Sequence, residues 1–265
     1  MKKIIAITGA SSGIGRATAR MMVDEGHIVY DLSRSDKPQD GVKHIRCDIV
    51  DVESVANAIQ TIKLEQERLD VLVLCAGMGV AGAVEFTSDV EMKRQFDVNF
   101  FGSIHVAQAV LPLMREQEKR CGERGRIVFI SSMAGVFALP YQAMYSASKA
   151  AINSIAFSLR AELKHTDVNV TCVMPGDVQT NFQRSSDSSC LASYPNFTKA
   201  LRQMEKDEAN GLTSNAVAKR VVLAAFTSNP NIYYTSDYIS DAQRFLARVL
   251  PSKWINYIVG KMYHC

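Results

Sequence analysis

The stretch "KIIAITGASSGIGRATAR", Lys3 to Arg20, decides the fold, because it joins an apolar run to a helical pattern through a glycine-rich loop. The run "IIAIT" indicates a strand that is buried on both faces. Glycines at positions 9, 13 and 15 permit a tight turn and let backbone N–H groups approach a pyrophosphate at a helix N-terminus. A plain strand-to-helix turn would also use glycines, but the position at a first strand–helix junction favours dinucleotide binding.

The rest of the chain repeats this alternation. Helical patterns at about 52–68, 91–118 and 145–162 separate short aliphatic runs at 27–33, 42–48, 69–77, 125–132 and 168–176. The sequence therefore predicts one α/β domain over residues 1–265, a Rossmann-like, doubly wound parallel sheet with helices on both faces. Ligands are expected at the carboxyl ends of the strands. The link of about ten residues before Val42 leaves room for only a short or degenerate helix.

Composition excludes several classes of function. A net charge of +3 without a dense basic tract argues against a nucleic-acid partner. No apolar run reaches the roughly 18 residues of a membrane span, and the early first strand leaves no room for a signal peptide. The 6 cysteines have neither metal-ligand nor paired spacing, so we expect no metal and a reducing, cytoplasmic location.

Two Tyr-x-x-x-Lys pairs compete for a role in proton transfer. Tyr145 and Lys149, in "MYSASKAAI", begin a helix that follows a strand ending at Ser132, whereas "YIVGK" at Tyr257 lacks such a serine and the small-residue spacer. A phenol with a pKa of about 10 is a poor acid–base catalyst at neutral pH. The ammonium group of Lys149, one helical turn away, would favour the phenolate. Tyr145 is therefore the candidate.

Further motifs appear in a set order over nearly the whole chain: "TGASSGIGR", "CDI", "CAG", "FDVNFFG", "ISSMAG", "YSASK" and "PGDVQT". Together they resemble the short-chain dehydrogenase/reductase family, with similarity to its 17β-hydroxysteroid and retinol dehydrogenase branch. The resemblance implies an NAD(P)-dependent dehydrogenase or reductase. It also implies a catalytic set of Asn99, Ser132, Tyr145 and Lys149.

Each member of that set has an implied role. Ser132 would donate a hydrogen bond to the substrate oxygen, and Tyr145 would exchange a proton with that oxygen as hydride moves. Lys149 would also bind the nicotinamide ribose. Asn99 would hold a water that links the lysine to solvent, although a helix-kink or capping amide is an alternative.

The family resemblance also implies a set of cofactor contacts. These are Gly9, Ser11, Ser12, Gly13, Ile14, Gly15, Ser33, Arg34, Asp48, Ile49, Cys75, Ala76, Gly77, Tyr145, Lys149, Pro175, Gly176, Val178 and Thr180. One departure is "LCAG" at 74–77, where the family usually has "NNAG"; this puts a supporting hydrogen bond in doubt.

The end of the second strand predicts which cofactor is preferred. An NAD-preferring member would carry an acidic residue there, whereas this chain has Ser33 and Arg34. A hydroxyl and a guanidinium suit a 2′-phosphate, so we expect NADP(H) over NAD(H). The alternative is that Arg34 is a solvated loop residue. Asp31 lies on the same face of the strand but farther inside.

The expected substrate is a lipophilic secondary alcohol or ketone that is steroid-, bile-acid- or retinoid-like. Apolar side chains near the site support this, and the substrate contacts expected are Ser132, Met133, Phe137, Tyr145 and Phe182. A 3-ketoacyl-type or general carbonyl reductase is the alternative. A non-catalytic NADP(H)-binding regulator is the alternative from a different class, but such a protein would be expected to lose Ser, Tyr or Lys at the site.

The chain is expected to divide by role. Residues 1–130 mainly bind cofactor, 131–180 form the catalytic segment, 181–213 form a substrate lid and 236–265 form a C-terminal helical tail. The apolar tail could pack on the core or a second subunit, cover the substrate pocket, or make peripheral contact with a membrane. The helices near 95–117 and 145–163 resemble the pair that dimerises the family, so a homodimer or homotetramer is expected.

Overall fold

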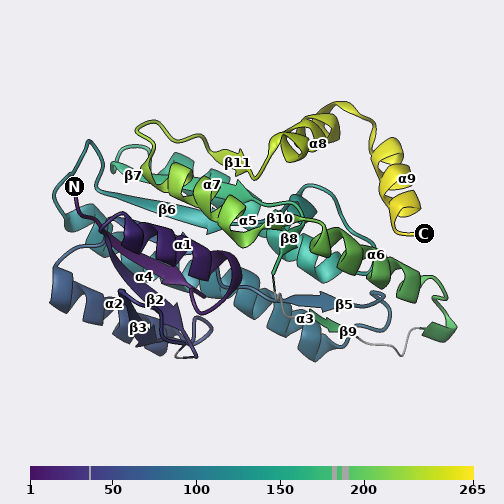
Figure 1. Cartoon of the computed structure of the whole chain (residues 1–265), viewed down its shortest axis with the longest axis horizontal. Coiled ribbons are helices and arrows are strands. Elements are labelled where there is room, and N and C mark those ends of the chain that lie inside the picture. The colour runs from purple at the N-terminus through teal and green to yellow at the C-terminus, as the bar shows by residue number, and fades with distance from the viewer. Residues whose placement is uncertain (36, 181–183, 187–190) are drawn as a thin grey trace.

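A computed structural model of the chain describes residues 1–35, 37–180, 184–186 and 191–265. Its centre is a seven-stranded sheet of order β11-β7-β6-β4-β1-β2-β3, in which every neighbouring pair is parallel. The strands are β1 (Ile4–Thr8), β2 (Ile28–Ser33), β3 (Val42–Arg46), β4 (Val71–Leu74), β6 (Gly125–Ile130), β7 (Val168–Met174) and β11 (Tyr233–Thr235). Helices cover both faces, which confirms the predicted doubly wound α/β fold (Figure 1).

Alternation along the strands produces two hydrophobic cores. Ile5 and Ile7 of β1 pack on one face with α1 (Gly13–Asp24) and α7 (Ser214–Phe226). Ile4 and Ala6 point to the other face, which is covered by α2 (Val52–Gln66), α4 (Gly102–Glu116) and α5 (Ala143–Glu162). Because both faces of the strands are buried, the strands read as continuous apolar runs.

The helical stretch expected over 91–118 is interrupted. It consists of α3 (Asp89–Phe96), a π-helical turn η1 (Asp97–Phe101) and then α4. The wide turn carries Asn99, whose side chain bonds to backbone outside the helix. Single π-helical turns of this kind are frequent at functional sites.

Short elements gather beyond the carboxyl ends of the strands, on the right in Figure 1. Within the expected lid, β9 (Arg184–Ser186) pairs with β5 (Gly79–Ala81), and β10 (Leu212–Thr213) pairs with β8 (Val178–Gln179). The remaining elements are the 3-10 turn η2 (Met133–Gly135), α6 (Phe197–Ala209), α8 (Tyr238–Val249) and α9 (Ser252–Met262). The last two form the predicted helical tail.

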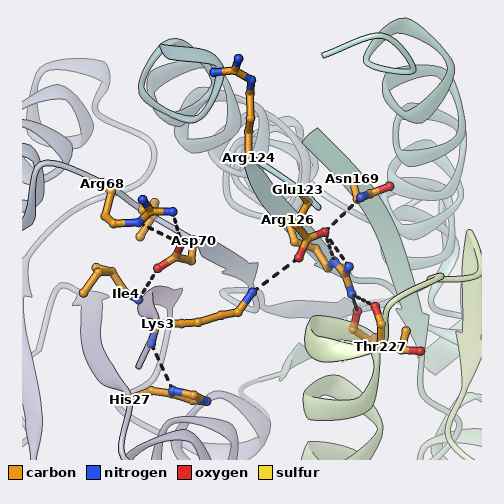
Figure 2. Close-up of polar contacts among 12 residues, drawn as sticks. Lys3, Ile4, His27, Arg68, Asp70, Glu123, Arg124, Arg126, Asn169 and Thr227 are labelled. Atoms are coloured by element: carbon orange, nitrogen blue, oxygen red, sulfur yellow. Dashed lines mark hydrogen bonds and ion pairs between the residues drawn. The ribbon is translucent and has the colours of Figure 1, made fainter. Parts of the chain in front are cut away.

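A buried polar network ties the elements together at the opposite end of the sheet (Figure 2). Arg126 of β6 is 2% exposed and donates to Glu123 Oε2 at 2.6 and 3.1 Å and to the Thr227 carbonyl at 2.7 Å. Glu123 also accepts from Asn169 at 3.0 Å and lies 3.6 Å from the Lys3 ammonium. The network therefore links β6, β7, the chain before β1 and the end of α7.

Removing the Arg126 cation should destabilise the fold strongly. In Arg126→Met the Glu123 carboxylate stays buried without its main partner, so the free energy of unfolding should fall by about 3 kcal/mol. Lys93→Met, which breaks the exposed Asp89–Lys93 pair, is the matched control and should cost under about 1 kcal/mol. Urea unfolding measures both, and equal losses would contradict the role given to the network.

Candidate active site

The glycine loop leaves no room for side chains against the loop that follows β4. Gly9 has φ of +71°, and a Cβ there would lie 2.9 Å from the Ala76 Cα. A Cβ on Gly15 would lie 2.5 Å from the Gly9 carbonyl oxygen. The Ser12 side chain forms no capping hydrogen bond at the start of α1. This cradle of bare backbone at a helix N-terminus therefore fits a pyrophosphate.

Thr8 holds the loop after β4 in the absence of the usual asparagine. Its hydroxyl oxygen accepts the N–H groups of Cys75 at 3.0 Å and Ala76 at 3.1 Å. Desolvation raises the pKa of the Cys75 thiol to about 11, so the thiol is neutral. The departure from the family pattern thus leaves the loop anchored through its backbone.

Asp31 connects the phosphate loop to the neighbouring strand. Its carboxylate is buried and accepts the Ala10 N–H at 2.9 Å and the Ser33 hydroxyl at 2.8 Å. His44 Nδ1, from the residue opposite on β3, lies 3.3 Å from the second oxygen. Arg34 follows at the exposed end of β2. The sequence analysis expected Asp31 to lie farther inside, but it did not identify His44 as its partner. That pairing follows only from the register of β2 and β3.

The residues after β3 are held against α4. Ile49 is buried, and a Cβ on Gly102 would lie 2.7 Å from its side chain. His105 Nδ1 lies 3.2 Å from the Ile49 carbonyl oxygen, so this histidine has a packing partner. The Asp48 carboxylate accepts the Val50 N–H at 3.1 Å and shapes the turn.

Tyr145 and Lys149 share one face of α5, beside the end of β6. Lys149 Nζ lies 5.8 Å from the centroid of the Tyr145 ring. The lysine is 6% exposed, and its Nζ donates to the Ile130 carbonyl at 2.9 Å. Burial lowers the pKa of Lys149. The second pair does not resemble this arrangement, because Tyr257 lies exposed on α9.

Asn99 joins the π-helical turn to the β4 loop and to α5. It is 1% exposed; its Oδ1 accepts the Met78 N–H and its Nδ2 donates to the Met78 carbonyl, both at 2.9 Å. The same nitrogen donates to Ser148 Oγ at 3.1 Å. A Cβ on Gly77 would lie 3.4 Å from Asn99 Oδ1 and 3.7 Å from Lys149 Nζ. Asn99, Gly77 and Lys149 therefore converge.

The side chains after β6 divide between the site and the core. Ser132 is partly buried and its Oγ accepts the Ala134 N–H at 3.1 Å at the start of η2. Met133, expected to touch substrate, is 6% exposed and packs in the core under α5. Phe137 is partly buried against the same cluster, and Phe182 lies outside the described residues.

The segment after β7 crosses in front of the phosphate loop. Its Pro175 carbonyl accepts the Met133 N–H at 2.8 Å, and the Gly176 N–H donates to Ser236 Oγ at 3.3 Å. Val178 pairs with the strand β10. Farther along, a Cβ on Gly13 would lie 3.5 Å from Thr180 Cγ2. The Thr180 side chain therefore lies against the phosphate loop at Gly13.

Other site chemistries find no support in the part of the chain that the structure describes. There, no cluster of three or more His, Cys, Asp or Glu side chains could hold a metal ion. A search of the same residues finds no helix long and apolar enough to cross a membrane.

Comparisons with known proteins agree with this geometry. A family model described as short chain dehydrogenase matches residues 3–190. The chain is 39% identical to a 3-ketodihydrosphingosine reductase of Bacteroides thetaiotaomicron over 236 residues, covering 86% of this chain and 85% of the relative. It is 33% identical to a probable short-chain type dehydrogenase/reductase, VdlC, of Helicobacter pylori, covering 94% and 93%.

A solved structure is also similar over almost the whole chain. It is a short-chain dehydrogenase from Streptomyces avermitilis, with a TM-score of 0.82 at 26% identity, covering 98% of this chain and 97% of that one.

Lys149→Met should leave the cofactor-free protein at least as stable as the wild type at pH 7, because it removes a desolvated ammonium. Since the folded-state pKa of Lys149 is lowered, the unfolded chain keeps the proton to higher pH. Wild-type stability should therefore rise as pH passes upward through the folded pKa toward the ordinary lysine value of about 10.4.

The difference between variant and wild type should accordingly shrink from pH 7 to about pH 10. Urea unfolding across this range measures it. Exposed Lys93→Met is the control, because the raised pKa of Lys93 keeps its small contribution nearly constant below the ordinary lysine pKa. A variant that is less stable at pH 7, by an amount that does not change with pH, would contradict the assigned cause.

Proposed function

The chain belongs to the short-chain dehydrogenase/reductase family, and from this premise we propose that it transfers hydride between NADP(H) and a lipophilic secondary alcohol or ketone. Family membership makes it an NAD(P)-dependent dehydrogenase or reductase. The observation that carries the proposal is the convergence of Lys149 with Tyr145, Gly77 and Asn99 at the carboxyl end of the sheet, beside the phosphate loop.

The proposed chemistry assigns each side chain one task. The nicotinamide, when bound, supplies or accepts the hydride. Tyr145 gives a proton to the substrate oxygen or removes it in the reverse direction, and Ser132 Oγ donates a hydrogen bond to that oxygen. Lys149 keeps positive charge beside the phenol, since its ammonium is fixed by the Ile130 carbonyl. Asn99 fixes the loop that carries Gly77, the glycine beside that ammonium.

Two observations support a preference for NADP(H). Arg34 is exposed just past the end of β2, where its guanidinium can reach a 2′-phosphate. The nearby Asp31 carboxylate is turned inside and engaged by Ala10, Ser33 and His44. Its oxygens are therefore engaged inside the fold and are not turned toward the rim of the site.

The substrate proposal is a long-chain or polycyclic lipid. Aromatic side chains gather beyond the strand ends, where Tyr141 stacks edge-on with Phe197 at 5.1 Å and with Tyr194 at 6.2 Å. The relative named as a 3-ketodihydrosphingosine reductase makes a long-chain 3-ketone the first compound to test. Steroid-, bile-acid- and retinoid-like ketones come next, and a general carbonyl or 3-ketoacyl reductase is the second candidate.

A homodimer or homotetramer in the cytoplasm is part of the same proposal. The support is two large apolar side chains left exposed on the helices that resemble the family's dimer pair. These are Phe101, at the start of α4, and Phe157, on the outer face of α5.

Tyr145→Phe should lower turnover of an active ketone by about 10²- to 10⁴-fold, because the group that exchanges the proton is gone. Cofactor affinity, followed by nicotinamide fluorescence, should fall far less than turnover, because the other expected cofactor contacts remain. Tyr257→Phe, in the second Tyr-x-x-x-Lys pair, is the matched control and should retain full activity. Wild-type turnover in Tyr145→Phe would refute the mechanism.

Arg34→Ala should weaken NADPH binding by about tenfold and leave NADH binding nearly unchanged, since only NADPH carries the 2′-phosphate. Arg115→Ala removes an equally exposed guanidinium from the end of α4 and serves as the control. Titration with both cofactors is the measurement. A wild-type protein that binds NADH more tightly than NADPH would overturn the assignment.

A further inference from the structure

The apolar face of α8 points away from the protein. Tyr238, Ile239, Phe245, Leu246 and Val249 recur at helical spacing and are all exposed, from 46% for Leu246 to 80% for Tyr238. A helix on the surface of a globular protein ordinarily buries such a stripe against the core. In α8 the apolar side chains face solvent and the polar side faces the protein, so packing within the domain does not explain the apolar stripe.

The opposite side of α8 is polar and packs on the body. Ser240 is the buried residue of this helix and bonds to Asp237, with its Oγ 3.2 Å from where a Cβ on Gly176 would lie. The Arg244 guanidinium stacks over the Tyr233 ring at 5.4 Å. Polar and cation–π contacts thus fix α8 with its apolar stripe outward.

The next helix, α9, also packs on the protein along one side and exposes apolar side chains on the other. Tyr263, just after it, is 5% exposed and packs with Val259 against Ala200 and Met204 of α6. On its other side Trp254, Tyr257, Ile258 and Met262 are exposed. The two helices follow one another at the edge of the molecule, in yellow in Figure 1. Both therefore expose large apolar side chains from anchored positions.

The charge of this surface is positive. Between Tyr238 and Met262 the one acidic residue is Asp241, against Arg244, Arg248, Lys253 and Lys261. The last three of these cations are exposed. Apolar and aromatic side chains flanked by Lys and Arg are the composition of helices that lie in the interface of an anionic membrane.

We propose that α8 and α9 form a docking surface for an anionic lipid bilayer, with their exposed apolar side chains in the interface and Arg248, Lys253 and Lys261 at the phosphate level. A second copy of the chain fits less well. A two-fold contact through this surface would bring the same cations together, and only Asp241 could offset them. The inference holds whether or not the proposed substrate is correct.

Docking there would set the orientation of the enzyme. The buried end of α9 contacts α6, and α6 packs near Leu139 and Tyr141 in the segment between Ser132 and Tyr145. A bilayer under the tail would therefore lie next to the apolar cluster at the substrate side of the site.

The test uses the full chain with vesicles of phosphatidylcholine, alone and mixed with phosphatidylglycerol. Trp254 is the only tryptophan, so its emission reports this surface directly. The expected results are co-sedimentation with the anionic vesicles, a blue shift of Trp254 emission, and weaker binding at high salt. Absence of sedimentation and shift, or equal binding to neutral vesicles, would overturn the proposal.

Two variants locate the binding. Arg248→Gln, Lys253→Gln and Lys261→Gln together should weaken binding by roughly a hundredfold, and Phe245→Gln with Ile258→Gln should weaken it about as strongly. Leu64→Gln, on the exposed face of α2, is the matched control and should bind as the wild type does. Unchanged binding in the tail variants would refute the surface. A change in the oligomeric state of the tail variants in the absence of lipid would also refute the proposal, because it would show that this surface binds a second copy of the chain.

Discussion

The close approach of two loop backbones, after β1 and after β4, is the constraint on which the site depends. Side chains are excluded where Gly9 meets Ala76 and where Gly15 meets the Gly9 carbonyl, and Thr8 fixes the separation through two N–H groups. That contact places the phosphate cradle beside Gly77, and Gly77 beside Lys149 and Asn99. The glycines therefore let the phosphate loop, the loop after β4 and the residues around Lys149 lie close together.

The two ends of the sheet use buried charge differently. At the amino end Arg126 is matched by Glu123 and by backbone carbonyls, which makes a stabilising joint between β6 and α7. At the carboxyl end Lys149 is also buried, but the described residues give its ammonium one hydrogen bond, to Ile130. The desolvation that lowers the pKa of Lys149 is a cost to the stability of the fold. The sheet therefore has a fully paired arginine, Arg126, at its amino end and, among the described residues, a lysine with few partners, Lys149, at its carboxyl end.

Some features followed from neighbouring residues in the chain, and others did not. The strands and the glycine loop could be predicted, because each depends on local periodicity or spacing. The choice of Tyr145 over Tyr257 stays a prediction, and the structure places Tyr145 beside the buried Lys149 and leaves Tyr257 exposed. The π-helical turn could not be predicted, and the Asn99 side chain that it carries bonds to Met78, a residue on a different element. The pairing of Asp31 with His44 required strand register, and the burial of Met133 required knowledge of how η2 turns toward β7.

The sequence by itself determined a doubly wound α/β fold and the family, because alternation and motif spacing are properties of nearby positions. Only the tertiary structure decided which way amphipathic segments face. The tail reads as one more helix with an apolar stripe, yet in α8 the polar side faces the body, with Ser240 next to Gly176 and Arg244 over the Tyr233 ring. A hydrophobic pattern predicts a buried face, but which surface buries it depends on contacts between residues far apart in the chain.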